Sequence, residues 1–262
     1  MDFGLTGKRA LVMSSSRGLG LGCAEMLAAE GVHVLLTGRS GDRLAQAADA
    51  ITAKGQGRAD YVVCDLTDKA AVDTLVAAAQ EVLGGVDILV NNTGGPPPGR
   101  MVDADLPVLA SQFDTMVMNV IALTARLLPA MQAQKWGRII TLGSSGVVQP
   151  IPNLGLSNAL RSALVGWSKS LSNDVAADGV TVNMLLPGRI HTERVDELDA
   201  GAANRTGKSL DDTRAASMAT IPAGRYGTVA EFAAVCAFLA STQASYVTGG
   251  LIRCDGGAIK SV

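Results

Sequence analysis

Aromatic side chains are scarce in this sequence. Phe, Trp and Tyr together make up 3% of the 262 residues, whereas hydrophobic residues as a whole reach 48%. The interior must therefore be built from Ala, Val, Leu and Ile, a composition that suits helices packed on a parallel sheet. A chain of this length buries a large core without the help of disulfides or metal ions.

Cysteines are few and offer no paired motif. Cys23, Cys64, Cys236 and Cys254 are widely spaced and form no CxxC pair, so we expect no metal site and a reduced setting. The first residues, MDFGLTGKRA, lack the apolar region of a signal peptide. We also find no uninterrupted apolar stretch near the roughly 20 residues that cross a bilayer. We therefore expect a cytoplasmic protein with no membrane partner.

An excess of positive charge is missing as well. The net charge is −2 and no long run of Lys or Arg occurs. The isoelectric point is about 5.7 and the mean hydropathy +0.27. This balance excludes nucleic acid and anionic membrane surfaces from the expected partners.

Short aliphatic runs alternate with Ala-rich stretches along the chain. The expected strands are Arg9–Met13, Val32–Thr37, Tyr61–Cys64, Val86–Asn91, Arg138–Leu142, Val180–Leu186 and Leu251–Cys254. The expected helices are Gly18–Glu30, Asp42–Lys54, Asp68–Leu83, Pro107–Gln134, Gly155–Ala177 and Val229–Ala240. Strict alternation predicts an α/β fold: a doubly wound parallel sheet (Rossmann fold) of about seven strands, with helices on both faces.

No linker, repeat or low-complexity tract divides the chain, so we expect a single domain over residues 1–262. The polar segment Glu193–Ala219 is too long for an ordinary connection. We expect it to carry short helices of its own and to belong to a substrate lid at about residues 189–225.

The first expected strand is followed by a glycine-containing turn, SSSRGLG at residues 14–20. In a strand–turn–helix unit such a turn lets backbone amides and the helix N-terminus receive a pyrophosphate. The GxGxxG spacing fails because Cys23 stands where Gly or Ala is needed. The spacing T-G-x-x-x-G-x-G fits, with Met13 and Ser14 in its first two places. The alternative is that the glycines only allow tight helix–sheet packing.

The end of the second strand lacks the acidic residue that binds the ribose 2′-hydroxyl in NAD-preferring sites. Gly38 occupies that position, and Arg17 and Arg39 bracket the place of a 2′-phosphate. A guanidinium group can bind two phosphate oxygens at once. We therefore predict that NADP(H) is preferred, with NAD(H) as the other candidate. The alternative is that both arginines are solvated surface residues.

Further pieces follow in order along the chain: Asp65, Asn91-Asn92-Thr93-Gly94, Asn119, Ser144, Pro187-Gly188 and the late sequence Cys254-Asp255-Gly256-Gly257. With the glycine turn, they make nearly the whole chain resemble the short-chain dehydrogenase/reductase family. Within that family it is most similar in pattern to the branch of 3-oxoacyl-carrier-protein reductases. The resemblance implies an NADP(H)-dependent oxidoreductase that acts on a small-molecule carbonyl or alcohol.

The resemblance also implies roles by position. Asp65 would bind the adenine amino group, Ser144 the substrate oxygen, and Asn119 a water of a proton relay. The expected cofactor-binding residues are Ser14, Ser16, Arg17, Gly18, Leu19, Gly20, Arg39, Asp65, Leu66, Asn92, Thr93, Gly94, Arg161, Pro187, Gly188, Ile190 and Thr192. The expected catalytic residues are Ser144, Asn119, Ser157 and Arg161. Ordinary alternatives are that Asp65 caps a helix, Asn92 shapes a turn and Ser144 binds only backbone.

One departure from the family pattern bears on chemistry. The family places a Tyr-x-x-x-Lys pair thirteen residues after its serine, and here those positions are Ser157 and Arg161. Serine is a much weaker acid than a phenol and its side chain is shorter. A missing general acid typically costs about 10²–10⁴ in rate. Arg161 stays cationic and can still bind the nicotinamide ribose.

The proton source is therefore open between a water on Ser157, His191, Tyr226 and none. A histidine side chain can act as a general acid, so His191 is one candidate, and the alternative is that it is a loop residue that points outward. Tyr226 reaches the cleft only if the lid folds over it. The stiff proline loop Gly94–Gly99 either shapes a substrate pocket or makes no ligand contact.

Three functions remain in competition. The first is an oxidoreductase with an atypical proton relay. The second is a non-catalytic or very weakly active nucleotide-binding homologue. The third is a fold kept for assembly, because the family commonly forms tetramers through two long helices and the last strand, here about residues 107–134, 155–177 and 251–254. We expect a homotetramer or homodimer.

Overall fold

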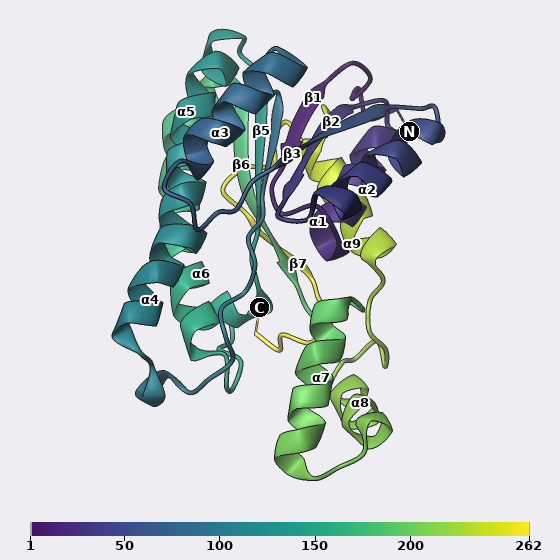
Figure 1. Ribbon diagram of the computed structural model, residues 1–262, viewed down its shortest axis with the longest axis vertical. Coiled ribbons are helices and arrows are strands. Elements are labelled where there is room, and N and C mark those ends of the chain that lie inside the picture. The colour runs from purple at the N-terminus through teal and green to yellow at the C-terminus, as the bar shows by residue number, and fades with distance from the viewer. Residues whose placement is uncertain (1, 262) are drawn as a thin grey trace.

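The computed structural model describes residues 2–261 and contains one seven-stranded parallel sheet (Figure 1). The strand order is β3-β2-β1-β4-β5-β6-β7. The strands are β1 (Arg9–Val12), β2 (His33–Gly38), β3 (Arg58–Val63), β4 (Ile88–Asn91), β5 (Gly137–Leu142), β6 (Val180–Pro187) and β7 (Leu251–Cys254). This topology confirms the predicted Rossmann fold, and the direction of strand addition reverses between β1 and β4.

Helices cover both faces of the sheet. The α-helices are α1 (Gly18–Ala29), α2 (Gly41–Ala53), α3 (Ala71–Ala78), α4 (Leu106–Phe113), α5 (Asn119–Ala133), α6 (Gly155–Val175), α7 (Glu193–Thr206), α8 (Leu210–Ala219) and α9 (Val229–Ala240). Helices α1, α2 and α9 pack on one face, and α3, α5 and α6 pack on the other. Helices α7 and α8 extend beyond one end of the sheet (Figure 1), and they supply the helices expected within Glu193–Ala219.

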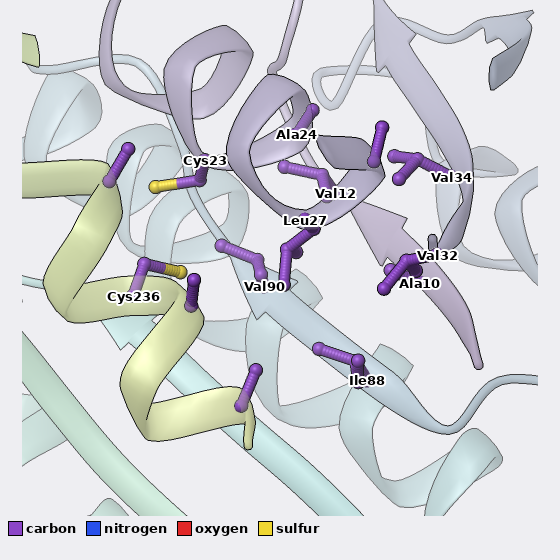
Figure 2. Close-up of a cluster of buried hydrophobic side chains, with 14 of the residues drawn as sticks. Ala10, Val12, Cys23, Ala24, Leu27, Val32, Val34, Ile88, Val90 and Cys236 are labelled. Carbon is purple, nitrogen blue, oxygen red and sulfur yellow. The ribbon is translucent and has the colours of Figure 1, made fainter. Parts of the chain in front are cut away.

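The core between α1, α9 and the sheet is aliphatic, as the composition predicts. Figure 2 shows Cys23 of α1 and Cys236 of α9 with their sulfur atoms turned toward each other among small side chains. Both are fully buried. A hydrogen bond with Cys236, together with burial, raises the pKa of the Cys23 thiol well above its usual value. Thiols in this state are inert packing groups.

The long helix predicted from residue 107 to 134 is not continuous. A π-helical segment, Asp114–Met118, joins α4 to α5. A π-turn inserts an extra residue and rotates the following helix, so Asn119 begins α5 at the carboxyl end of the sheet. Residue periodicity did not indicate this break, because apolar residues continue through it.

Among residues 2–261, one composite helix meets the length and hydropathy criteria for a membrane-crossing helix. It runs from Leu106 to Ala133, reaches a mean hydropathy of 1.4 in its most apolar window, and buries 22% of that window. The scan for uninterrupted apolar runs missed it because polar residues punctuate the sequence. This finding rests on length and composition alone, and core helices of soluble proteins meet the same criteria.

Candidate cofactor and substrate site

The turn after β1 lies against the loop after β4, where the sheet reverses its order. The Asn92 amide donates to the Ser14 carbonyl at 3.1 Å. A Cβ atom on Gly20 would lie 2.6 Å from that carbonyl oxygen and 2.8 Å from the Asn92 amide nitrogen. A side chain at position 20 would therefore push these two segments apart, so this glycine is required for the close approach.

Gly18 is the first residue of helix α1, and the space beside its backbone leaves room for a ligand. Its φ is +62°, and a Cβ atom there would meet only Thr192 at 4.0 Å. Arg17, the residue before the helix, makes no capping bond to the first amides with its side chain. Free amides at a helix N-terminus attract anionic groups such as phosphate.

Basic side chains surround this helix start. Arg17 forms an ion pair with Glu193 of α7, and Arg43 of α2 lies 3.6 Å from the same carboxylate. The hydrogen bond from Arg17 holds the pKa of Glu193 below its usual value. Arg39 directly follows β2, and its charge contributes to the lowered pKa of Asp65. Glu193 therefore neutralises part of this basic cluster, and Glu197 lies at 4.0 Å from Arg17 as a second, more distant carboxylate.

The residues expected around the adenosine lie at the carboxyl ends of β3 and β4. Asp65 accepts hydrogen bonds from the backbone and hydroxyl of Thr67, both at 2.9 Å. The backbone bond is the main cause of its lowered pKa. Gly94 has no atom within 4 Å of an added Cβ, so the loop here borders open space. Thr93 is buried and helps to anchor it.

Ser144 follows the carboxyl end of β5, and Asn119 contacts the loop after the carboxyl end of β3. The Ser144 oxygen accepts from the Gly146 amide at 3.0 Å, which leaves its hydroxyl proton free to point at a ligand. The Asn119 amide donates to the Leu66 carbonyl at 2.7 Å. This hydrogen bond ties the start of α5 to the loop after β3, at the residue that directly follows the π-helical segment.

Ser157 and Arg161 lie one turn apart on α6. The Ser157 hydroxyl has no hydrogen-bond partner within residues 2–261. Arg161 is partly buried and donates to the Leu142 carbonyl at 2.9 Å. Burial, and then the nearby charge of Arg194, lower the pKa of Arg161 to about 10, so its guanidinium remains protonated at neutral pH.

Arg194 of α7 reaches across the cleft to the proline loop. It donates to the Pro96 carbonyl at 3.2 Å and to the Glu197 carboxylate at 3.2 Å. An added Cβ on Gly95 would lie 3.6 Å from this guanidinium. The proline loop, whose role the sequence left open, is therefore in contact with the first turn of α7.

The segment after β6 is rigidly held. A Cβ on Gly188 would meet the Asp255 backbone at 2.6 Å, which explains why glycine stands there. Ile190 is buried and bridges to Gly227. Thr192 caps α7 by accepting from the Val195 amide. Pro187 ends β6 beside Cys254 of β7.

The two alternative proton donors are engaged elsewhere. The Tyr226 hydroxyl donates at 2.9 Å to Asp199, a carboxylate that is 1% exposed and also bound by Arg189. His191 lies 3.4 Å from Asp196 with 65% of its side chain exposed. Both belong to a polar network that ties α7 to the segments around it. No group of side chains suited to hold a metal ion occurs in the part of the chain that the structure describes.

Sequence reasoning missed three residues that the structure brings to this site: Arg43, Glu193 and Arg194. The only signal was their position in the first turn of an expected helix. Charged residues at helix starts are usually solvated. Their place in the sequence therefore did not indicate that α2 and α7 bring them close to the turn after β1.

The chain is similar to known reductases. Residues 13–258 match a family model described as enoyl-(acyl carrier protein) reductase. The chain is 36% identical over 253 residues to the 3-oxoacyl-(acyl-carrier-protein) reductase FabG of Salmonella typhimurium, an alignment that covers 96% of this chain and 97% of that protein.

Two solved structures have the same fold. L-sorbose reductase from Gluconobacter frateurii, complexed with NADPH and L-sorbose, is similar with a TM-score of 0.94 and 32% identity over 100% of both chains. A single-residue variant of the actinorhodin polyketide ketoreductase with NADPH is similar with a TM-score of 0.90 and 29% identity, covering 96% of this chain and 97% of that chain.

Proposed function

The chain belongs to the short-chain dehydrogenase/reductase family, and we propose that it is an NADP(H)-dependent oxidoreductase of a carbonyl or alcohol substrate with an atypical proton relay. The observation that carries the proposal is the open backbone at Gly18 and Gly94 on either side of the β1–β4 reversal. Open α/β sheets bind ligands at this point.

The residues present fit the phosphorylated dinucleotide. The amides that begin α1 suit the pyrophosphate, and Arg17, Arg39 and Arg43 gather near the end of β2, where Gly38 brings no negative charge. The similar reductases named above are described with NADPH. We therefore assign the 2′-phosphate to this basic cluster.

The bound cofactor would supply the hydride. Ser144 would then donate its free hydroxyl proton as a hydrogen bond to the substrate oxygen, since its lone pair is already bonded by the Gly146 amide. The unpartnered Ser157 hydroxyl would hold a water that delivers a proton to that oxygen, and the hydroxide left behind would take a proton from bulk solvent through the water held by Asn119. Arg161 would stabilise negative charge as it develops there. Asn119, which directly follows the π-helical segment, would hold a second water of the relay in place.

Kinetics with a matched pair of variants test this relay. We expect wild-type protein to oxidise NADPH with at least one carbonyl of a chemically varied panel, and Ser144→Ala to lower kcat by about 10²-fold. Ser145→Ala, one residue along the same turn, is the control and should leave kcat unchanged. A Ser144→Ala variant as active as wild type contradicts the assignment.

The second candidate is a non-catalytic nucleotide-binding homologue. It is favoured by the engagement of Tyr226 with Asp199 and by the exposed position of His191, which leave no side-chain acid at the site. The double variant Ser157→Tyr/Arg161→Lys separates the two. If only this double variant oxidises NADPH with a carbonyl substrate, the wild-type protein is a non-catalytic homologue. If wild type turns over by itself, the enzyme function is correct.

We further propose that residues 1–262 act as one domain in which residues 189–225 form a substrate lid. The buried Asp199, bound by Arg189 and Tyr226, would make α7 and α8 move as a unit.

An apolar surface supports the proposed homo-oligomer. A hollow of about 460 Å³ lies between α4 and α6, lined by Leu106, Leu109, Ala110, Phe113, Asp114, Ala159 and Leu160. The side chains of Val102 and Leu106 are 76% and 71% exposed. Contiguous apolar surface of this kind marks an interface, and we assign it to a second copy of the chain. Sedimentation of Phe113→Glu against wild type tests it, with a smaller species expected for the variant.

A further inference from the structure

Arg161 is partly buried and has fewer hydrogen-bond partners than the buried Arg138. Arg138, at the opposite end of β5, donates to the carbonyls of Ser241, Gly137 and Gly179. Arg161 donates only to the Leu142 carbonyl. A guanidinium has five N–H donors, so most of those on Arg161 have no acceptor among residues 2–261.

A second positive charge lies near the first. Arg194 comes from α7, 33 positions further along the chain, yet it lies close enough to Arg161 to lower its pKa. Its contact with the Pro96 carbonyl holds it over the loop after β4. Its one acidic neighbour, Glu197, is 53% exposed and one turn along α7, and no carboxylate lies within ion-pair distance of Arg161 in the described residues. Among the described residues, only the exposed Glu197 carboxylate offsets these two positive charges, and it pairs with Arg194 rather than Arg161, so a bound anion would relieve the remaining repulsion.

The cofactor does not supply that counter-ion at this end of the site. The proposed pyrophosphate and 2′-phosphate positions lie at the start of α1 and the end of β2, where other arginines meet them. The nicotinamide ring of NADPH carries no negative charge. The remaining candidate for an anion beside Ser144 is the substrate.

We infer that the substrate carries a compact terminal anion, a carboxylate or a phosphate monoester, and that Arg161 and Arg194 bind it together beside Ser144. This inference rests on the proposed function for the identity of the pocket. Planar guanidinium groups bind such anions through paired hydrogen bonds. The short side chain of Ser157, one turn before Arg161, leaves an anion room to approach the guanidinium.

Dead-end complexes test the inference without requiring turnover. NADPH-loaded protein is titrated calorimetrically with short 2-hydroxy and 3-hydroxy acids, with their methyl esters, and with the matching phosphate monoesters and alcohols. At least one anion should bind about tenfold or more tightly than its neutral partner. The acid and phosphate arms then identify which anion the site prefers.

Variants test whether the two arginines cause the preference for the anion. Arg161→Gln and Arg194→Gln should each remove the preference for the anion, whereas Arg194→Lys should keep part of it. Arg205→Gln, at the other end of α7 and exposed, is the matched control and should bind like wild type. Thermal unfolding of each variant checks that it remains folded.

Two results would overturn the inference. One is that no anion binds more tightly than its ester or alcohol. The other is that Arg194→Gln weakens NADPH binding while the preference for the anion persists, which would assign this guanidinium to the pyrophosphate. Failure of the proposed function is distinct, since it appears as no NADPH binding to folded protein, and the anion titration can then be repeated on the unloaded chain.

Discussion

The two ends of the parallel sheet treat charged side chains in opposite ways. At the amino end, Arg9 binds both oxygens of the nearly buried Asp87, and Arg138 is enclosed by three carbonyls and the Trp136 ring. At the carboxyl end, Arg161 has one acceptor and the nearby charge of Arg194 lowers its pKa.

This contrast separates structural charge from charge kept for a ligand. Groups whose hydrogen bonds are complete within the chain contribute to stability alone, whereas groups left incomplete at a ligand-binding edge are available for chemistry. Variants at the amino end should therefore change unfolding and leave ligand binding intact. Variants at the carboxyl end should do the reverse.

The largest effect is expected for Arg138→Leu. This change leaves the carbonyls of Ser241, Gly137 and Gly179 without their buried donor, which should lower the free energy of unfolding by about 3–5 kcal/mol. Urea unfolding measures it, and the NADPH dissociation constant of the folded variant should be unchanged. Arg126→Leu is the exposed control, with a loss below about 1 kcal/mol. If Arg138→Leu and Arg126→Leu lower the free energy of unfolding equally, the proposed difference between buried and exposed arginines is wrong.

Gly38→Asp should have a large effect on binding and a small one on folding. An added Cβ would lie 3.2 Å from the Ser16 side chain, a contact that a small shift of that side chain relieves. The carboxylate would repel the 2′-phosphate and accept from a free ribose hydroxyl. The ratio of the NADPH to the NADH dissociation constant should rise about 100-fold. Gly38→Asn, which adds no charge, should change the ratio less.

Asp87→Asn is expected to cost about 2 kcal/mol at neutral pH. Burial raises the pKa of Asp87, but bonds from Arg9 and Gln134 outweigh it and lower the pKa below its usual value. The stabilisation is therefore present above the unfolded pKa and is lost as the pH falls through the lower folded one. The stability gap between wild type and variant should stay constant from pH 7 to about 5 and close below about 4. A gap that is independent of pH would contradict this.

The smallest effect concerns the link between the basic cluster and α7. Glu193→Gln removes the carboxylate that pairs with Arg17 and Arg43. NADPH should then bind about threefold more tightly at low salt, with NADH changed less, because these contacts are exposed and screened. Glu197→Gln is the neighbouring control, since its distance to Arg17 is 4.0 Å. Weaker NADPH binding by Glu193→Gln would contradict this prediction and would show that the carboxylate holds the arginines in place for the cofactor.

Alternating aliphatic strands and helices were sufficient to predict the Rossmann sheet, because each buried parallel strand must be covered on both faces. Helix α9 and strand β7 were predicted with their observed bounds. Helix α3 began three residues later than expected, since Asp68 forms a turn with the Ala70 amide. The π-turn before Asn119 left no periodic signal. The assigned roles of Ser144, Asn119, Ser157 and Arg161 stay predictions.

The sequence by itself determined the alternation of strands and helices in a parallel sheet, the glycine turn after β1, and the spacing that puts Ser157 and Arg161 on one face of a helix. These follow from local periodicity and spacing, which a single segment carries. Only the tertiary structure decided that Arg194 reaches the proline loop, that Glu193 meets Arg17, and that Tyr226 is bound to Asp199. The physical reason is that these contacts join segments far apart in the chain, so their distances depend on how α7 packs against the completed sheet.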